Sequence, residues 1–222
     1  MRLGVVTGLR IEAGRFAAQD PLSLIATGAG AGAREACRRL LDDGAQALLG
    51  LGLAGGLEDD VGPGEIILAD DVRLPSGALR PCDGAWRAHL QALLLRRPWT
   101  VRTGTLLGSE QVIGSPAEKR ELAATGAIAV DTESHHLAIA AGEAAMPFAV
   151  IRVVADRAQD HLPVFAADTY DDGGRLRLSA VLGGLLRHPG ELPALLRLAR
   201  QSRQALAVLG GVGRLGAALG PP

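Results

Sequence analysis

The chain has 222 residues, a formal net charge of −1 and 48% hydrophobic residues. This length and hydrophobic content predict one α/β domain, residues 1–222, with a substantial core. Because phosphate contacts need clustered cations, the near-neutral charge predicts no nucleic-acid partner. Cys37 and Cys82 are too few and too distant in sequence for a disulfide framework or a metal-binding knuckle. The sequence contains no run of about 18 apolar residues, so we predict no membrane span.

Apolar runs alternate with helical patterns along the chain. The runs predict strands at residues 2–7, 22–27, 47–51, 66–69, 101–107, 127–130 and 148–154. Helical periodicity predicts helices at residues 34–41, 83–96, 115–126, 176–186 and 191–209, with a further helix following residue 133. Residues 70–82 are predicted as a loop because they are rich in Pro, Gly and Asp. The spacing of strands and helices predicts a three-layer α/β/α fold around a central parallel or mixed sheet.

Glycine-rich segments follow two of the predicted strands. The first, residues 28–33, lets backbone N–H groups and a helix N-terminus face a ligand, and it fits the dinucleotide pattern G-x-G-x-x-A. A nicotinamide-binding unit also needs an acid after the next strand, but residues 52–56 form a second glycine-rich segment there. We therefore expect both segments to contact one shared ligand. A nicotinamide-dependent oxidoreductase is the disfavoured alternative, and tight turns without a ligand are another.

Two carboxylates lie just past the ends of two buried strands. Glu133 follows the strand at 127–130, and Asp156 follows the strand at 148–154. Ligands of open α/β sheets bind beyond the carboxyl ends of the strands, so we expect both acids at one site. His135 and His136 lie close to Glu133, but no H-E-x-x-H spacing exists and the other histidines are scattered. We therefore expect no metal site.

Other local patterns have structural interpretations. Ser115, Pro116 and Glu118 predict a helix N-terminus with a capping box. Residues 157–174 are irregular, and a connection of that length in a compact domain is typical of a lid or a substrate loop. The leucine- and arginine-rich end, residues 176–209, fits either an amphipathic helix packed on the sheet or a surface resting on an anionic membrane.

Taken in order, five segments resemble the purine nucleoside phosphorylase and nucleosidase superfamily: residues 4–8 with Glu12, 52–57, 61–66, 130–134 and 152–156. Residues 127–135, 147–152 and 189–196 are similar to the branch called hopanoid-associated phosphorylases. The resemblance implies a nucleoside phosphorylase-like fold, cleavage of the N-glycosidic bond of an adenine nucleoside, no cofactor, and a homo-oligomer. Inorganic phosphate would be a co-substrate if the reaction is a phosphorolysis.

The resemblance also implies roles for individual residues. Asp156 matches the acid that protonates purine N7, which a departing purine requires because it leaves poorly as an anion. Glu133 matches the carboxylate that holds the ribose 2′- and 3′-hydroxyls and favours developing positive charge. Glu12 matches the base that activates water in the hydrolytic nucleosidases. The further substrate-binding residues that we expect are Gly28, Gly55, Gln111, Val112 and Thr132.

The nucleophile stays open at this stage. Phosphorylases of this superfamily hold phosphate with an arginine and a serine or threonine near the second glycine segment, where this chain has Gly50 and Leu53. Arg10 and Arg15 are the candidates to replace them, because a guanidinium binds phosphate bidentately. The branch resemblance favours phosphorolysis. The alternatives are a hydrolytic methylthioadenosine/S-adenosylhomocysteine-type nucleosidase and a non-catalytic nucleoside-binding module.

The branch resemblance further predicts adenosylhopane as substrate, an adenosyl group joined through its 5′ carbon to a large hydrocarbon. The predicted lid would supply an apolar wall for it from Leu162, Pro163, Val164, Phe165 and Tyr170. We expect a cytoplasmic protein whose C-terminal helices make peripheral contact with the inner face of the membrane.

Overall fold

The computed structural model describes residues 1–17, 23–171 and 173–222. The strands are β1 (Leu3–Thr7), β2 (Leu24–Thr27), β3 (Ala47–Gly56), β4 (Ile66–Arg73), β5 (Leu79–Pro81), β6 (Val101–Gly108), β7 (Ala127–Asp131) and β8 (Phe148–Asp156). The helices are α1 (Arg10–Ala17), α2 (Gly32–Asp42), α3 (Gly84–Leu94), α4 (Pro116–Ala123), α5 (Ser134–Glu143), α6 (Leu178–Arg187) and α7 (Leu192–Gly213). Short 3₁₀ turns are η1 (Ala166–Thr169), η2 (Pro189–Glu191) and η3 (Gly216–Leu219). Leu22, the first residue of the predicted second strand, lies outside the described residues.

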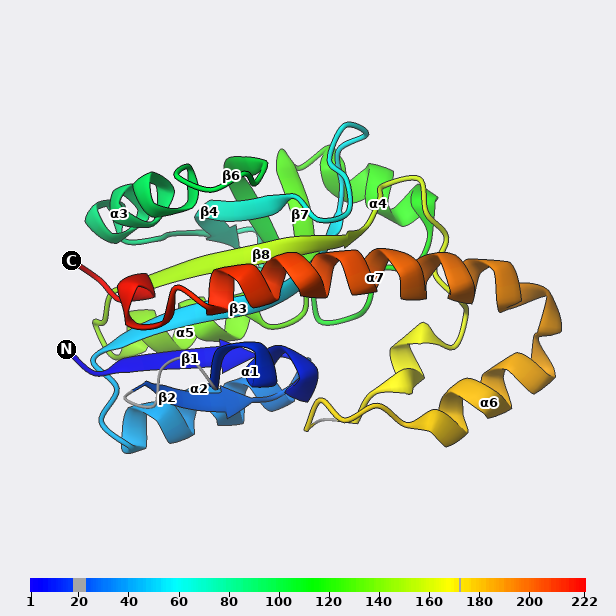
Figure 1. Ribbon diagram of the computed structural model, residues 1–222, viewed down its shortest axis with the longest axis horizontal. Coiled ribbons are helices and arrows are strands. Elements are labelled where there is room, and N and C mark those ends of the chain that lie inside the picture. The colour runs from blue at the N-terminus through cyan, green and yellow to red at the C-terminus, as the bar shows by residue number, and fades with distance from the viewer. Residues whose placement is uncertain (18–22, 172) are drawn as a thin grey trace.

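The strands form one mixed sheet, as predicted. Its order is β2-β1-β3-β7-β6-β4-β5, and β8 pairs with both β3 and β4. The β3–β8 pairing is parallel and the β4–β8 pairing is antiparallel. Because β4 also pairs with β6, β6 with β7, and β7 with the end of β3, these five strands close into a ring. In Figure 1, α7 crosses in front of β8 and β3, whereas α5 lies behind them.

Hydrophobic cores fill the space between the sheet and the helices on each of its two faces. One core joins the sheet to buried residues of α2 and α5: Ala36, Cys37, Leu40, Leu137, Ala138 and Ala141. The other joins it to buried residues of α1, α3 and α7: Phe16, Trp86, Leu90, Leu94, Ala205, Leu209 and Val212. Apolar residues at helical spacing thus face the sheet from both sides, which gives the predicted three-layer arrangement.

Strands extend into two predicted loops, so the first of these predictions was wrong and the second was wrong in part. The second glycine segment continues β3 to Gly56, because β8 pairs with this stretch and compensates for the weak strand propensity of glycine. Within the predicted loop 70–82, β4 continues to Arg73 and turns through Gly77, at φ +86°, into β5. The capping box at Ser115 and Glu118 is confirmed at the start of α4.

The strand register explains why the two predicted carboxylates meet. Gly55, near the end of β3, pairs with Val130 of β7 and also with Asp156 of β8. Glu133 follows β7 by two residues, so β3 holds the ends of both acid-bearing strands at one end of the ring. Beyond this end, α6 and the first turns of α7 project as an arm away from the sheet (Figure 1). No helix of the described segments has the length and apolar character needed to cross a membrane.

Candidate active site

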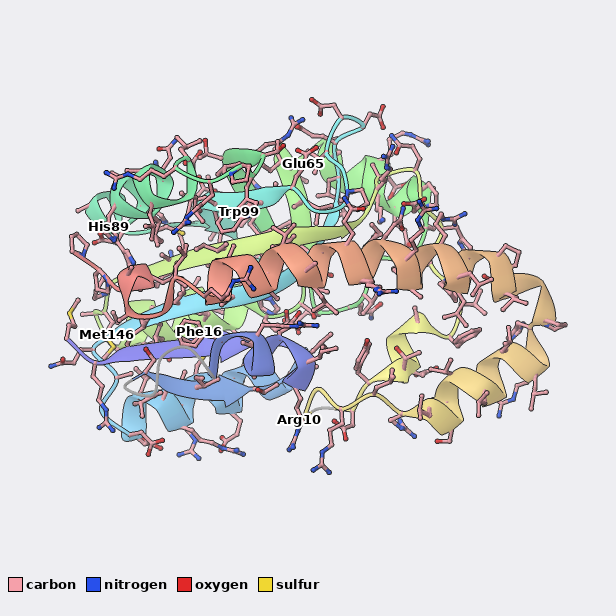
Figure 2. All side chains as sticks on the ribbon, viewed as in Figure 1. Arg10, Phe16, Glu65, His89, Trp99 and Met146 are labelled. Carbon is pink, nitrogen blue, oxygen red and sulfur yellow. The ribbon has the colours of Figure 1, made fainter. Side chains whose placement is uncertain are left out.

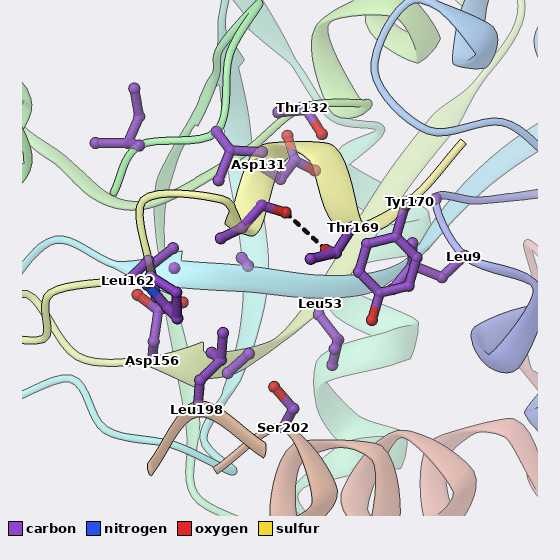
Figure 3. Close-up of a pocket in the computed structure, with 18 of the residues that line it drawn as sticks. Leu9, Leu53, Asp131, Thr132, Asp156, Leu162, Thr169, Tyr170, Leu198 and Ser202 are labelled. Atoms are coloured by element: carbon purple, nitrogen blue, oxygen red, sulfur yellow. Dashed lines mark hydrogen bonds between the residues drawn. The ribbon is translucent and has the colours of Figure 1, made fainter. Parts of the chain in front are cut away.

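A cavity of about 430 Å³ lies between the end of the strand ring and the projecting arm. Figure 3 shows Leu53 and Asp156 near the sheet, with Leu198 and Ser202 of α7 on a neighbouring wall and Tyr170 on another. Glu12 of α1, Glu133 before α5 and Asp156 at the end of β8 contribute carboxylates, and the arm contributes an apolar wall. The lining residues used below are Glu12, Gly55, Gln111, Val112, Thr132, Glu133, Asp156, Leu162, Pro163, Phe165, Tyr170, Leu178, Val181, Leu195 and Leu198.

Glu12 is fixed in the cavity from two directions. It lies in the first turn of α1 with its side chain buried, and Oε2 accepts a hydrogen bond of 2.8 Å from the Leu9 N–H. Its Oε1 accepts a hydrogen bond of 3.0 Å from the N–H of Leu53 on β3. Burial and the nearby charge of Glu133 raise the pKa of Glu12 to about 7. A carboxylate with this pKa is suited to accept a proton at neutral pH.

Glu133 precedes α5 and is held by short contacts from three elements. Its Oε1 accepts hydrogen bonds from the Thr132 hydroxyl at 2.5 Å and from the Gly30 N–H at 3.3 Å. Its Oε2 lies 3.5 Å from Nη2 of Arg152. Burial raises the pKa of Glu133 and the Arg152 charge opposes that effect. A Cβ atom at position 8 would lie 2.9 Å from this carboxylate, so the close approach of Glu133 requires a glycine there.

Arg152 is a buried residue next to Glu133 to which the motif analysis assigned no role. It projects from the otherwise apolar strand β8 and is 1% exposed. Its Nε donates to Asp131 and its Nη2 donates to the Ser134 hydroxyl at 3.1 Å, and Ser134 in turn donates to Asp131. A buried charge is tolerated only when paired, so an arginine inside an apolar strand signals a partner acid. That signal was present in the sequence.

Asp156 ends β8 and is paired with Lys119 of α4. Nζ of Lys119 donates to Oδ2 of Asp156 and, at 2.7 Å, to the backbone oxygen of Arg157. Burial raises the pKa of Asp156, and the Lys119 charge opposes that effect. Lys119 has no exposed side-chain surface and is the only lysine of the chain. A lone lysine among arginines was the one sequence signal for this partner.

The remaining predicted contacts divide into two groups. Gly55, Gln111, Val112 and Thr132 line the cavity as expected. Gly28 does not: its N–H donates to the Thr7 backbone oxygen at 3.0 Å, and any side chain there would collide with the backbone of Gly32. Glycine at position 28 therefore serves the turn between β2 and α2.

The two arginines that were predicted to hold phosphate point elsewhere. Arg10 is exposed, at the outer surface in Figure 2, and its Nε donates to the backbone oxygen of Gly173 at 3.4 Å. Arg15 is exposed and lies beside Gly210 of α7. Neither contributes to the cavity lining. Both residues lie in α1, where only the inward face, carrying Glu12, reaches the site.

Comparison with known proteins identifies the class of protein that this fold and site define. A family model described as the phosphorylase superfamily matches residues 4–181. The chain therefore belongs to the phosphorylase superfamily. It is an enzyme of the nucleoside phosphorylase and nucleosidase class. No curated protein sequence matches the chain significantly.

Solved structures with the same fold include three bacterial nucleoside hydrolases. S-adenosylhomocysteine nucleosidase from Streptococcus pyogenes, in complex with 5-methylthiotubericidin, superposes with a TM-score of 0.70 at 14% identity over 98% of each chain. The 5′-methylthioadenosine/S-adenosylhomocysteine nucleosidase of Helicobacter pylori superposes with a TM-score of 0.69 at 15% identity, over 95% of this chain and 97% of that one. Futalosine hydrolase of Helicobacter pylori superposes with a TM-score of 0.68 at 14% identity, over 94% of this chain and 95% of that one. At these identities the likeness establishes the fold.

Proposed function

We propose that the protein hydrolyses the N-glycosidic bond of an adenine nucleoside that carries a large apolar 5′ substituent, with adenosylhopane as the substrate. The observation that carries the proposal is a single cavity whose polar end holds Glu12, Glu133 and Asp156 and whose other wall is apolar. The three acids are each at most 7% exposed, so each acts in a largely desolvated site.

The three carboxylates match the steps of the reaction. Asp156 donates its proton to purine N7 while the C1′–N9 bond breaks and its electron pair moves into the purine ring. Glu133 accepts hydrogen bonds from the 2′- and 3′-hydroxyls and stabilises the oxocarbenium-like ribosyl group. Glu12 takes a proton from the water that attacks C1′. Gln111 and Val112 also line the cavity and are the residues that would contact the edge of the base.

Water fits the polar end of the cavity better than phosphate does. Glu12, Asp131 and Glu133 face Arg152, so three acids surround one guanidinium that already donates to Asp131 and Ser134. A phosphate dianion would meet uncompensated negative charge there. Arg10 and Arg15, the two candidates to hold phosphate, lie outside the lining. The pKa of Glu12, about 7, suits a base for water.

An apolar wall supports the large 5′ substituent. The segment between β8 and α6 contributes Leu162, Pro163 and Phe165, and the helices of the arm contribute Leu178, Val181, Leu195 and Leu198. Of the predicted wall residues, Val164 is 59% exposed and does not line the cavity. Hydrocarbon against such a wall gains roughly 0.8 kcal/mol per buried CH₂. A free nucleoside would leave this wall without a partner.

The outer surface of the arm supports peripheral membrane contact. Leu182 and Leu186 lie about one turn apart on α6 and are 62% and 84% exposed. Arg187, the last residue of α6, is also exposed, as is Arg200 on α7. Leucines beside cations suit an anionic bilayer, from which a lipid-linked substrate would reach the cavity.

Cosedimentation with vesicles of phosphatidylglycerol and phosphatidylcholine tests this surface. The double variant Leu182→Ser/Leu186→Ser should bind the vesicles less than wild type does. The matched control is Leu95→Ser, whose leucine is 60% exposed just past α3. Equal binding by all three proteins would contradict the proposed membrane contact.

The substrate experiment follows adenine release by chromatography, with and without phosphate. Adenosylhopane in mixed micelles is compared at equal concentration with adenosine and methylthioadenosine. We expect the highest kcat/KM on adenosylhopane, a rate independent of phosphate, and a product with a free anomeric hydroxyl. A large preference for the small nucleosides would exclude the hopanoid substrate, and a ribosyl 1-phosphate product would exclude hydrolysis. The homo-oligomer implied by the family resemblance is a separate prediction, which light scattering on the purified protein tests.

A further inference from the structure

A cluster of metal-ligating side chains lies outside the cavity, at the start of α5. His135 and His136 are 1% and 5% exposed, and their ring centroids are 3.9 Å apart. Glu110, in the connection between β6 and α4, places Oε1 at 3.3 Å from Nε2 of His135. One ligand atom from each of the three residues lies within 4.8 Å of the others. Three potential ligands therefore converge at one point.

The two imidazoles lack the partners that buried polar groups normally have. Neither nitrogen of His135 or of His136 makes a hydrogen bond within the described residues. Buried imidazoles without a hydrogen-bond partner require an explanation, and a bound ion supplies one.

We propose that Glu110, His135 and His136 bind one zinc-like divalent transition-metal ion. Two imidazole nitrogens and a carboxylate oxygen are ligands that Zn²⁺ accepts, whereas Mg²⁺ and Ca²⁺ prefer oxygen ligands alone. Three protein ligands leave a fourth tetrahedral position for water. The Glu110 side chain is 63% exposed, so the ion has a route from solvent.

The position of the ion suggests a structural role that is independent of bond cleavage. Glu110 directly precedes Gln111 and Val112, which line the cavity, and α5 directly follows Glu133. A bound ion would hold the connection that carries Gln111 and Val112 against the first turn of α5. The sequence predicted no metal site because it has no H-E-x-x-H spacing and its other histidines are scattered. The fold directs Glu133 to Arg152 and brings Glu110, from the connection after β6, to the two histidines.

The test uses the full chain after treatment with a chelator and dialysis. Calorimetric titration with ZnCl₂ gives the stoichiometry and Kd, and the visible absorption of Co²⁺ reports four-coordinate geometry. We expect one ion per chain in wild type. Glu110→Gln and His136→Gln should weaken binding by more than about 100-fold, since even loss of an outer-shell partner costs roughly 10–100-fold.

Glu191→Gln is the matched control, because Glu191 Oε1 also lies 3.3 Å from a histidine, His161, but without a second buried imidazole. It should bind the ion as wild type does. Glu110 is exposed, so Glu110→Gln should keep its metal-free Tm and lose only the rise in Tm that ZnCl₂ causes in wild type. Absence of binding in wild type, or equal binding by wild type and Glu110→Gln, would overturn the proposal.

Discussion

The pH dependence of stability provides a direct test of the environment assigned to Glu12. The folded protein raises the pKa of this carboxyl from 4.5 to about 7, mainly by burial. The folded state therefore binds the proton more tightly than the unfolded state does. Stability is greatest below the unfolded pKa and falls as the pH rises through the folded pKa. Glu12→Gln carries no titrating group, so it should not show this loss.

The magnitude follows from the pKa shift. With values of 4.5 and about 7, ionisation of Glu12 disfavours the folded state by about 0.8 kcal/mol at pH 5 and about 3.3 kcal/mol at pH 8. The stability of Glu12→Gln relative to wild type should thus increase by about 2.5 kcal/mol over this range. Glutamine has one acceptor oxygen for the N–H groups of Leu9 and Leu53, but the cost of the lost hydrogen bond is the same at both pH values.

Urea unfolding of both proteins at pH 5 and pH 8 measures this difference. The control is Glu121→Gln, an exposed carboxyl on α4, whose stability should follow wild type. Activity provides a second measurement, because Glu12→Gln should lower kcat by roughly 10²–10⁴-fold if Glu12 is the base. A stability difference that does not change with pH would refute the assigned pKa. Wild-type turnover by Glu12→Gln would refute the assigned role.

Other substitutions test the remaining groups of the site. Asp156→Asn should lower kcat by roughly 10²–10⁴-fold with a smaller effect on KM, since a general acid acts in the transition state; unchanged turnover would exclude this role. Glu133→Ala should impair both kcat and KM, because the ribose hydroxyls are held before and during the reaction, and wild-type kinetics would remove Glu133 from the site. Lys119→Met should raise the pKa of Asp156, because the positive charge beside it is lost. The alkaline limb of the pH profile of kcat/KM should then move to higher pH. A limb at the wild-type pH would contradict the pairing of Lys119 with Asp156.

Local patterns in the sequence were sufficient for most of the fold and pointed to Glu133 and Asp156, whereas Glu12 was proposed from the family resemblance. Apolar runs predicted every strand except the edge strand β5, whose residues are exposed and too few to show a period. Asp156 was found because it ends a continuous apolar run. The last residues of β4 were predicted as loop because the segment is rich in Pro, Gly and Asp, which favour loops. Pairing with β6 nevertheless continues β4 to Arg73.

The sequence by itself determined which segments are strands and helices, since alternation, helical spacing and capping act between near neighbours. It also predicted a shared site for Glu133 and Asp156, because each acid follows a buried strand. The register of β3 against the antiparallel β7 and the parallel β8 is what brings the two acids together. Only the tertiary structure decided the partners of buried charges. Arg152 reaches Asp131 and Lys119 reaches Asp156 across distant segments, so strand register and helix packing select those pairs. The same long-range packing turned Arg10 to the outer surface, because the side of α1 that faces the sheet depends on neighbours that no local pattern encodes.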